Sequence, residues 1–267
     1  MSKVVLITGA SSGIGKAIAV YLQNKNYTVY GTSRNPEKVI KSPFSLVALD
    51  VTKPETIQAA INTIIDKEKK IDILINNAGK GITGAIEDTP TQEIKTNFET
   101  NFFGAIEVIK GVLPQMRKQN SGLIINITSI ASYMGLPFRG IYSASKSALA
   151  IVSETLSMEV KEFGIKVTTI APGDFATNIA AGRYHTPVFE TSAYKQKYAE
   201  NLALMDAHVN SGMNPVKMAE KVYQIINTKK PRIHYKVGGF TEKFSIVLKR
   251  ILPDKWYEKL LMNHYKL

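Results

Sequence analysis

Short apolar runs alternate with longer helix-competent segments along this chain of 267 residues. The runs 3–7 and 71–75 are apolar apart from Lys3 and Asp72, as strands buried on both faces of a parallel sheet are. The alternation therefore predicts an α/β fold, with a doubly wound parallel sheet of the Rossmann type and helices on both faces. The predicted strands are 3–7, 27–32, 45–49, 71–75, 123–126, 166–170 and 232–237, and the predicted helices include 17–23, 54–65, 92–113, 142–163 and 244–252.

The length predicts one domain, 1–267, because two domains would each have a small core. Within it, 178–214 is expected to form a substrate lid and 238–267 an amphipathic C-terminal extension. The absence of cysteine excludes disulfides, thiol nucleophiles and Cys-zinc sites, and it suits a reducing compartment. No apolar stretch approaches the roughly 18 residues of a membrane span, and no signal peptide is expected. We therefore expect a soluble, cytoplasmic protein.

A glycine-rich loop follows the first predicted strand. Gly9, Gly13 and Gly15 lead into the helical pattern 17–23. Glycines allow the backbone to turn tightly and to approach a phosphate, and a helix N-terminus offers free N–H groups and a positive dipole. The loop predicts a dinucleotide-phosphate cradle, although a simple turn is the alternative.

The end of the second predicted strand indicates which dinucleotide is preferred. An acidic residue there accepts hydrogen bonds from the ribose hydroxyl of NAD, but this chain has Ser33 followed by Arg34. A hydroxyl and a guanidinium would bind a 2′-phosphate. We therefore expect NADP(H) to be favoured over NAD(H), the alternative being that Arg34 only faces solvent.

Tyr142 and Lys146 are four residues apart at the start of the predicted helix 142–163. At that spacing both side chains lie on one helical face. A positive charge beside a phenol favours the phenolate, so the pair suits proton transfer. Ser129 ends a predicted strand and Asn101 interrupts a predicted helix, and both are candidates for the same site. The spacing alone also fits a surface lysine beside a half-buried tyrosine.

Together these motifs resemble the single-domain short-chain dehydrogenase/reductase family, particularly the branch of 17-beta-hydroxysteroid and retinol dehydrogenases. The resemblance covers residues 3–178 closely. It is carried, in order, by Thr8-Gly9-x3-Gly13-x-Gly15, Asn76-Asn77-Ala78-Gly79, Asn101, Ser129, Tyr142-x3-Lys146 and Pro172-Gly173-x3-Thr177.

The resemblance implies an NAD(P)-dependent oxidoreductase that interconverts carbonyls and alcohols. Tyr142 would donate a proton to the carbonyl, Lys146 would assist Tyr142 and hold the nicotinamide ribose, and Ser129 would bind the substrate oxygen. Asn101 would position a water that passes protons towards Lys146. No metal is needed for this chemistry, and the four histidines lie too far apart in sequence to suggest a metal site.

The resemblance also implies a cofactor site. The residues expected to bind NADP(H) are Gly9, Ser11, Ser12, Gly13, Ile14, Gly15, Ser33, Arg34, Asp50, Val51, Asn77, Ala78, Gly79, Tyr142, Lys146, Pro172, Gly173, Phe175 and Thr177. Many NADP-preferring relatives have a basic residue where this chain has Ser12. The expected preference therefore depends mainly on Arg34.

The expected lid, 178–214, is rich in aromatic and aliphatic residues. They are Tyr184, His185, Phe189, Tyr194, Tyr198, Leu202, Leu204 and Met205. An apolar lid favours a lipophilic substrate such as a steroid, a retinoid or a long-chain aldehyde. The alternative is that these side chains only pack against the scaffold.

The net charge of +12 is concentrated after Lys217, where basic residues are dispersed among apolar ones. Nothing there resembles a nucleic-acid-binding module. Solvated helix faces, an acidic partner and an anionic membrane surface all remain open, and the C-terminal helices could touch a membrane peripherally. The resemblance also implies a homodimer or homotetramer.

Three alternative functions remain. One is a 3-oxoacyl thioester reductase of the same family, and another is a non-catalytic NADP-binding regulator. Sugar-nucleotide epimerases and dehydratases share the Tyr-x3-Lys pattern, but they have a different glycine spacing and a larger C-terminal domain.

Overall fold

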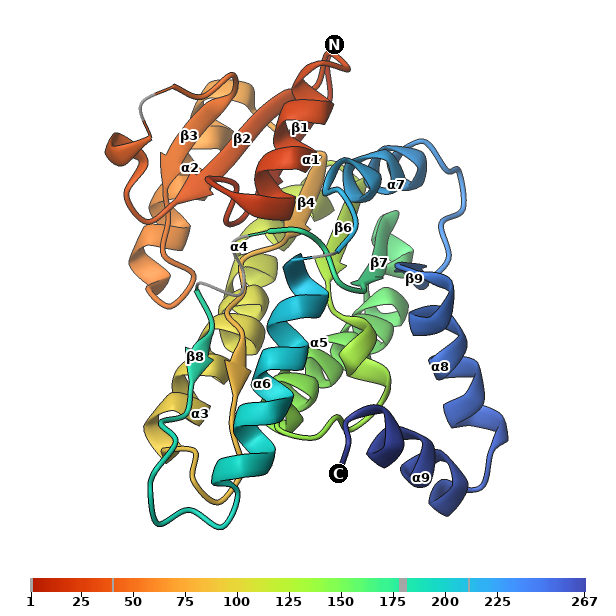
Figure 1. Cartoon of the computed structure of the whole chain (residues 1–267). Coiled ribbons are helices and arrows are strands. Elements are labelled where there is room, and N and C mark those ends of the chain that lie inside the picture. The colour runs from red at the N-terminus through yellow and green to blue at the C-terminus, as the bar shows by residue number, and fades with distance from the viewer. Residues whose placement is uncertain (1, 40, 178–181, 211) are drawn as a thin grey trace.

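A seven-stranded sheet forms the centre of the molecule (Figure 1). The computed structural model describes residues 2–39, 41–177, 182–210 and 212–267. The strand order is β3-β2-β1-β4-β6-β7-β9, and every neighbouring pair is parallel. The strands are β1 Val4–Ile7, β2 Thr28–Ser33, β3 Ser45–Ala48, β4 Ile73–Asn76, β6 Gly122–Ile127, β7 Ile165–Pro172 and β9 His234–Val237. This confirms the predicted doubly wound parallel sheet.

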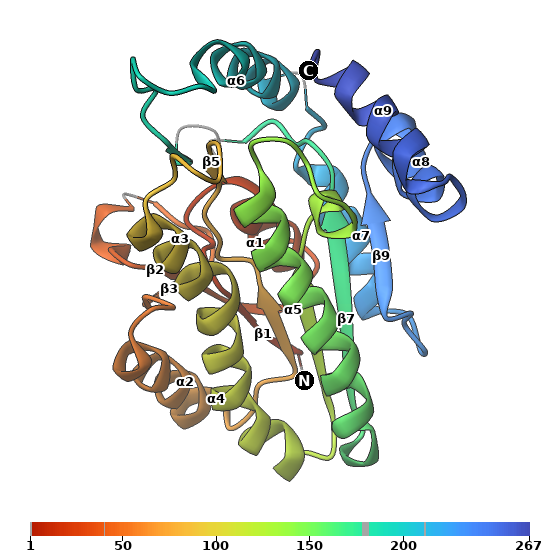
Figure 2. The same ribbon diagram turned by 90° about the horizontal axis from the view of Figure 1, so that it is seen from below.

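Helices cover both faces of the sheet, as predicted (Figures 1 and 2). One face carries α1 Gly13–Gln23 and α7 Val216–Ile226. The other carries α2 Pro54–Glu68, α4 Gly104–Lys118 and α5 Gly140–Glu159. The remaining helices are α3 Thr91–Phe98, α6 Lys195–Asn210, α8 Phe240–Ile251 and α9 Asp254–His264, with short turns η1 Pro36–Lys38, η3 Ile130–Tyr133 and η4 Lys161–Phe163.

The core consists of two apolar layers separated by the sheet. Successive residues of a strand point to opposite faces, so Leu6 and Leu74 pack with α2 and α4, whereas Ile7 and Ile75 pack with α1 and α7. Both layers exclude water, which explains why the central strand β1 is apolar at every position rather than alternating. Burying one such side chain contributes about 1.5–3 kcal/mol.

The strand order reverses between β1 and β4. The chain moves outward from β1 to β3 and then returns to place β4 on the other side of β1. At such a reversal the loops at the carboxyl ends of the two strands diverge and leave a crevice. The predicted site residues that follow β1, β2, β4, β6 and β7 all lie at this edge of the sheet.

The predicted single helix 92–113 is wrong in one respect. A π-helical turn, η2 Glu99–Phe103, separates α3 from α4, and α4 continues through Pro114 to Lys118. The apolar pattern could not show the π turn, because a shift of one residue in hydrogen bonding changes the pattern little. The helix predicted over 142–163 is α5, which ends at Glu159. Gly164, in the left-handed region with φ 68°, follows the short turn η4.

Several elements were not predicted. A second, two-stranded parallel sheet pairs β5 Ile82–Thr83 with β8 Tyr184–His185, and α6 lies inside the segment expected to form a lid. Residues 178–181 and 211 of that segment lie outside the described residues. No helix in the described part of the chain combines the length and the apolar character needed to cross a membrane.

Candidate active site at the carboxyl ends of the strands

The glycine loop after β1 has the shape of a phosphate cradle. Gly9 and Gly13 lie in the left-handed region, with φ of 65° and 55°, which side chains disfavour. A Cβ on Gly15 would collide with the carbonyl of Gly9 and the side chain of Asn77. Ser12 is the N-cap of α1, but in the described structure its side chain makes no capping hydrogen bond. The N-terminus of the helix can therefore bind an anion. These residues fit the pyrophosphate of a dinucleotide.

Hydrogen bonds fix this loop to the end of β4. The Thr8 hydroxyl accepts from the backbone N–H groups of Asn77 and Ala78 at 2.9 and 3.0 Å. The Asn77 side chain in turn donates to the carbonyls of Thr8 and Gly9 at 3.0 and 3.1 Å. The carboxyl ends of β1 and β4 are thereby joined by polar contacts, and the cradle is held in shape without a ligand.

The residues expected near the adenine lie at the ends of β2 and β3. The Ser33 hydroxyl accepts a bond from the backbone of Asn35, and Arg34 is exposed beside it. Burial raises the pKa of Asp50, but hydrogen bonds from Thr52 and the charges of Arg34 and Lys53 outweigh burial and lower it overall. Arg34 is therefore close enough to Asp50 to influence its charge.

Val51 lies against the start of α4. A Cβ on Gly104 would be 2.7 Å from the carbonyl oxygen of Val51, so the helix and the loop after β3 are in close contact. This contact places the loop after β3 beside the crevice.

The loop after β7 lies opposite the glycine cradle. A Cβ on Gly13 would be 3.5 Å from the side chain of Thr177, so the two loops face each other. The backbone N–H of Gly173 donates to Val237 of β9 at 2.8 Å. Phe175 is 3% exposed and packs with the core layer of α1 and α7. The loop can therefore form one wall of a cofactor cleft.

Glu242 of α8 holds this loop from the other side. Its carboxylate accepts from the backbone N–H groups of Asp174 at 2.7 Å and Gly239 at 2.6 Å. A Cβ on Gly173 would collide with the same carboxylate. One side chain thus binds both the loop after β7 and the N-terminus of α8, where a negative charge is favourable.

Tyr142 and Lys146 share one face of α5, as predicted. Tyr142 is half-buried and lines the large pocket described below, and its phenol has no hydrogen-bond partner among the described residues. The Arg139 guanidinium lies 5.7 Å from the centre of its ring. The phenol can therefore donate to a bound ligand.

Lys146 is buried, with 4% of its surface exposed. Its Nζ donates to the backbone carbonyl of Ile127 at 3.0 Å, at the end of β6. Burial lowers its pKa from 10.5 to about 8, because water no longer stabilises the ammonium. A Cβ on Gly79 would be 3.2 Å from this nitrogen, so Lys146 reaches the crevice beside Gly79.

Asn101 lies in η2 and is fully buried. Its side chain accepts from the backbone N–H of Lys80 at 2.8 Å and donates to the Lys80 carbonyl at 2.9 Å. It also donates to Asn97 and Ser145, each at 3.2 Å. The side-chain oxygen of Asn101 would be 3.2 Å from a Cβ on Gly79, as would the Nζ of Lys146. Asn101 and Lys146 therefore border one small space.

Ser129 follows β6 and is 7% exposed. Its hydroxyl oxygen accepts from the backbone N–H of Ala131 at 3.1 Å and caps the turn η3. The hydroxyl proton remains available to a ligand, because this bond uses only the oxygen. Ser129 and Tyr142 line the same pocket.

That pocket has a volume of about 590 Å³ and is walled largely by apolar side chains. Its lining includes Ser129, Tyr142 and the loop after β7, together with residues of the C-terminal helices. The lining residues of α8, α9 and the segment after it include Leu248, Tyr257, Leu260, Leu261 and Tyr265. Hydroxyl groups able to bind a carbonyl oxygen therefore face a lipophilic cavity.

The segment expected to form the lid contributes four of its described residues to the pocket. They are Arg183, Met205, Gly212 and Met213. Tyr198 is buried against Phe138 and bonds to Thr83, whereas Phe189 and Tyr194 are exposed. The side chain of Leu204 lies outside the described structure. The C-terminal extension supplies more of the pocket wall than the expected lid does.

Sequence reasoning missed several site residues. Asn97 and Ser145 bond to each other at 3.0 Å and support Asn101, and the spacing of four between Asn97 and Asn101 was an available signal. No sequence pattern indicated Glu242 or Arg139, and both line the pocket. Burial raises the pKa of Tyr265. The described residues contain no group of three or more His, Asp or Glu placed to hold a metal ion.

Comparison with known proteins gives a consistent result. The family model described as short chain dehydrogenase matches residues 3–187. The chain is 39% identical to a 3-ketodihydrosphingosine reductase of Bacteroides thetaiotaomicron over 98% of both chains. A short-chain dehydrogenase structure from Streptomyces avermitilis has a TM-score of 0.83, 32% identity and coverage of 97% of this chain and 98% of that one. The structure of ElxO with NADP bound has a TM-score of 0.72, 27% identity and coverage of 89% and 97%.

Proposed function

Because the chain belongs to the short-chain dehydrogenase family of oxidoreductases, we propose that it reduces a ketone on a long, apolar substrate with NADPH as the hydride source. The observation that carries this proposal is the pocket, in which Ser129 and Tyr142 face the apolar wall of α8 and α9. The first substrate to test is 3-ketodihydrosphingosine, which the Bacteroides relative is named for.

A nicotinamide cofactor fits the crevice, and we assign its parts to the chain as follows. The open N-terminus of α1 and the loop of Gly9 to Gly15 would hold the pyrophosphate. Ser33 and Arg34 would bind a 2′-phosphate, which supports NADPH over NADH. The loop after β7, held by Glu242, would position the nicotinamide.

The chemistry then follows from the positions of the side chains. When bound, the reduced nicotinamide supplies a hydride to the carbonyl carbon. Ser129 donates a hydrogen bond to the carbonyl oxygen and polarises it. Tyr142 donates its proton to that oxygen as the C=O bond becomes C–OH. Lys146, four residues away on the same face of α5, stabilises the phenolate that remains.

The proton lost by Tyr142 has to be replaced in each turnover. Burial lowers the pKa of Lys146 to about 8, so Lys146 can release and regain a proton close to neutrality. Asn101 and Lys146 border the space beside Gly79, which we assign to a water that connects Lys146 to solvent.

The pocket supports a lipophilic substrate by its size and its walls. A volume of about 590 Å³ lies within the range of small-molecule pockets. Leu248, Leu260 and Leu261 offer apolar surface at a distance from the polar end of Ser129 and Tyr142. A chain of methylene groups would gain about 0.8 kcal/mol for each one that it buries there.

A 3-oxoacyl thioester is the second candidate substrate. Arg139 and Arg183 also line the pocket. Guanidinium groups suit the phosphate groups of the carriers that hold such thioesters. The carbonyl of a thioester substrate would be reduced in the same way as that of a long-chain ketone. The two candidates differ only in the group that Arg139 and Arg183 would bind.

The test compares substrates and one variant. Purified protein is incubated with NADPH or NADH and with 3-ketodihydrosphingosine, a ketosteroid, a retinoid aldehyde or a 3-oxoacyl thioester, and the alcohol formed is identified by mass spectrometry. We expect the long-chain ketone to give the highest kcat/KM with NADPH. Tyr142→Phe should lower kcat by roughly 10²–10⁴-fold and leave the Kd of NADPH nearly unchanged.

Tyr21→Phe is the matched control, because Tyr21 lies on α1 against Tyr223 and away from the pocket. It should retain normal turnover. Full activity of Tyr142→Phe would contradict the mechanism, and a preference for small polar carbonyls would contradict the assignment of the pocket.

A further inference from the structure

Helix α8 has two apolar faces, of which the fold uses only one. Ile246 is buried and packs with Leu248 and Leu252 beside the pocket. On the opposite side Phe240, Phe244, Val247 and Ile251 are 76%, 44%, 45% and 68% exposed. Their spacing of four, three and four residues places them in one stripe along the helix. A helix that packs on one side needs one such stripe, so the second requires another explanation.

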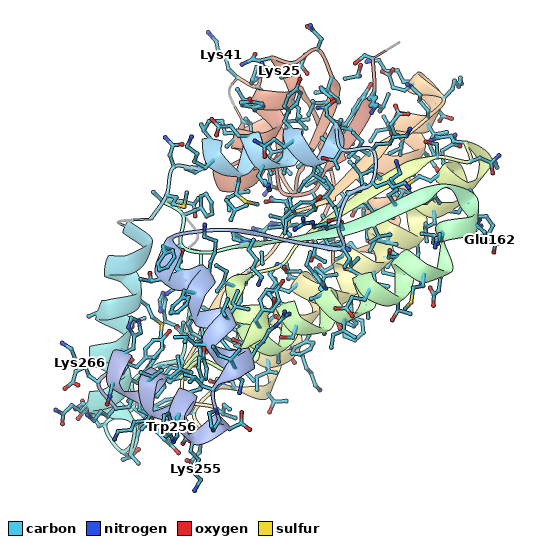
Figure 3. All side chains as sticks on the ribbon, turned by 90° about the vertical axis from the view of Figure 1, so that its right-hand side faces the viewer. Lys25, Lys41, Glu162, Lys255, Trp256 and Lys266 are labelled. Carbon is cyan, nitrogen blue, oxygen red and sulfur yellow. The ribbon has the colours of Figure 1, made fainter. Side chains whose placement is uncertain are left out.

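Helix α9 adds two large apolar side chains to the same corner of the molecule. Trp256 is 68% exposed and Leu260 is 47% exposed. The two helices are joined by a short turn and lie side by side (Figures 2 and 3). We define the outer apolar surface as Phe240, Phe244, Val247, Ile251, Trp256 and Leu260. Exposed apolar residues gathered in this way mark an interaction site more often than scattered ones do.

Basic residues border the outer apolar surface. Lys243 and Arg250 are exposed on α8, next to the apolar stripe, and Lys255 and Lys259 are exposed on α9. Figure 3 shows Lys255 and Trp256 projecting at the same edge. Large apolar side chains with a border of Lys and Arg are the composition of helices that lie on anionic lipid.

The acidic residues of these helices hardly offset this charge. Glu242 is directed inward and bonds to the backbone at Asp174 and Gly239. Asp254 accepts a hydrogen bond from Lys249 at 3.0 Å. In the described part of α8 and α9, Glu258 is the one exposed carboxylate without a hydrogen-bond or ion-pair partner. The surface is therefore apolar and net positive, and it complements a negatively charged bilayer.

The position of the surface relative to the pocket adds a second argument. Leu248, Tyr257 and Leu261 line the pocket from the inner side of the same two helices, and Leu260 belongs to both the pocket and the outer apolar surface. In the described structure α8 and α9 thus carry pocket-lining residues on one side and the outer apolar surface on the other. A substrate dissolved in a bilayer would meet the pocket wall there.

We propose that the chain docks peripherally on anionic lipid bilayers through the outer apolar surface, with its basic border contacting the lipid head groups. Trp256 and the two phenylalanines enter the boundary between head groups and acyl chains, where aromatic side chains are favoured. Docking is independent of turnover and of the identity of the substrate. It goes beyond the proposed function, because a reductase of a lipophilic ketone could equally act in water.

The test is sedimentation with vesicles of phosphatidylcholine alone or with added phosphatidylglycerol. The wild-type protein should bind the anionic vesicles, and added salt should weaken binding. The triple variant Phe244→Ser, Ile251→Ser, Trp256→Ser should bind at least 100-fold more weakly, because each loses apolar area that docking buries. Lys243→Ser with Arg250→Ser should reduce binding about 25-fold on anionic vesicles, at roughly 5-fold for each charge.

Two variants serve as controls. Val216→Ser removes an apolar side chain of α7 that is 43% exposed at another site and should bind vesicles like the wild type. Tyr142→Phe should also bind normally, so failure of the proposed function leaves this result unaffected.

Two outcomes would overturn the proposal. One is equal vesicle binding by the wild type and the triple variant. The other is absence of vesicle binding together with a change of oligomeric state in the triple variant by size-exclusion chromatography, which would assign the surface to a second copy of this chain.

Discussion

The Nζ of Lys146 donates a hydrogen bond of 3.0 Å to the backbone carbonyl of Ile127, at the end of β6. This bond holds the ammonium in a position with 4% exposure, and burial lowers its pKa to about 8. Below pH 8 Lys146 is charged, and its buried position is unfavourable for that charge. The proposed mechanism requires a proton donor at this place.

The first prediction concerns the pH dependence of stability. Between about pH 8 and 10.5 the unfolded chain keeps Lys146 protonated, whereas the folded protein releases the proton, so rising pH favours the folded state. From roughly pH 7.5 to 9.5 the free energy of unfolding should rise by about 2 kcal/mol in the wild type relative to Lys146→Met. Urea titrations of both proteins measure this, and parallel pH profiles would disprove it.

The second prediction concerns the choice of cofactor. Arg34 is exposed at the end of β2 and can form charge-assisted hydrogen bonds to a 2′-phosphate. Arg34→Ala should raise the Kd of NADPH roughly 10- to 100-fold, the equivalent of 1.5–3 kcal/mol, and leave NADH binding unchanged. Fluorescence titration with each cofactor measures the effect. Lys38→Ala, which removes an exposed charge four residues away, is the control, and an equal loss for both cofactors would refute the assignment.

The third prediction concerns the space beside Gly79. A methyl group there would lie 3.2 Å from both the Asn101 oxygen and the Lys146 nitrogen, closer than a carbon normally approaches them. Gly79→Ala should lower kcat about 10- to 100-fold by displacing these groups, while the free energy of unfolding changes by less than about 1 kcal/mol. In Gly135→Ala the added methyl meets no atom within 4 Å, so normal activity is expected.

The fourth prediction concerns the link between α8 and the loop after β7. Glu242→Gln replaces one of the two oxygens that accept backbone N–H groups with an amide that cannot accept. The free energy of unfolding should fall by about 1–3 kcal/mol, and the Kd of the cofactor should rise because the loop is less well held. Glu258→Gln on α9 should stay within about 0.5 kcal/mol of the wild type. Equal behaviour of the two variants would show that Glu242 has no such role.

The sequence predicted the sheet well because its strands carry a strong signal. Ile7 and Ile75 belong to runs that are apolar at every position, and only a strand buried on both faces needs that pattern. The glycine loop was equally clear, since Gly9 and Gly13 adopt backbone angles that other residues disfavour. Local patterns therefore predicted the scaffold and the positions of Tyr142 and Lys146.

The rest of the site depends on contacts between distant parts of the chain. Glu242 meets Asp174 across 68 positions, and no local pattern at either residue indicates the other. The π turn around Asn101 is stabilised by bonds to Lys80 and Ser145, which the helical pattern of 92–113 does not contain. The aromatic composition of 178–214 could not show that Tyr198 packs against Phe138, nor that α9 lines the pocket.

The pocket wall formed by Tyr257 and Tyr265 lies at the opposite end of the sequence from the glycine cradle. During synthesis the two halves of the site therefore leave the ribosome at different times. At roughly 5–20 residues per second, Tyr265 follows Tyr142 by about 6–25 s. For that interval the nascent chain contains Tyr142 and Lys146 beside an unfinished cavity. The cavity is complete only after α9 has been made, so a ligand of this pocket binds late in synthesis.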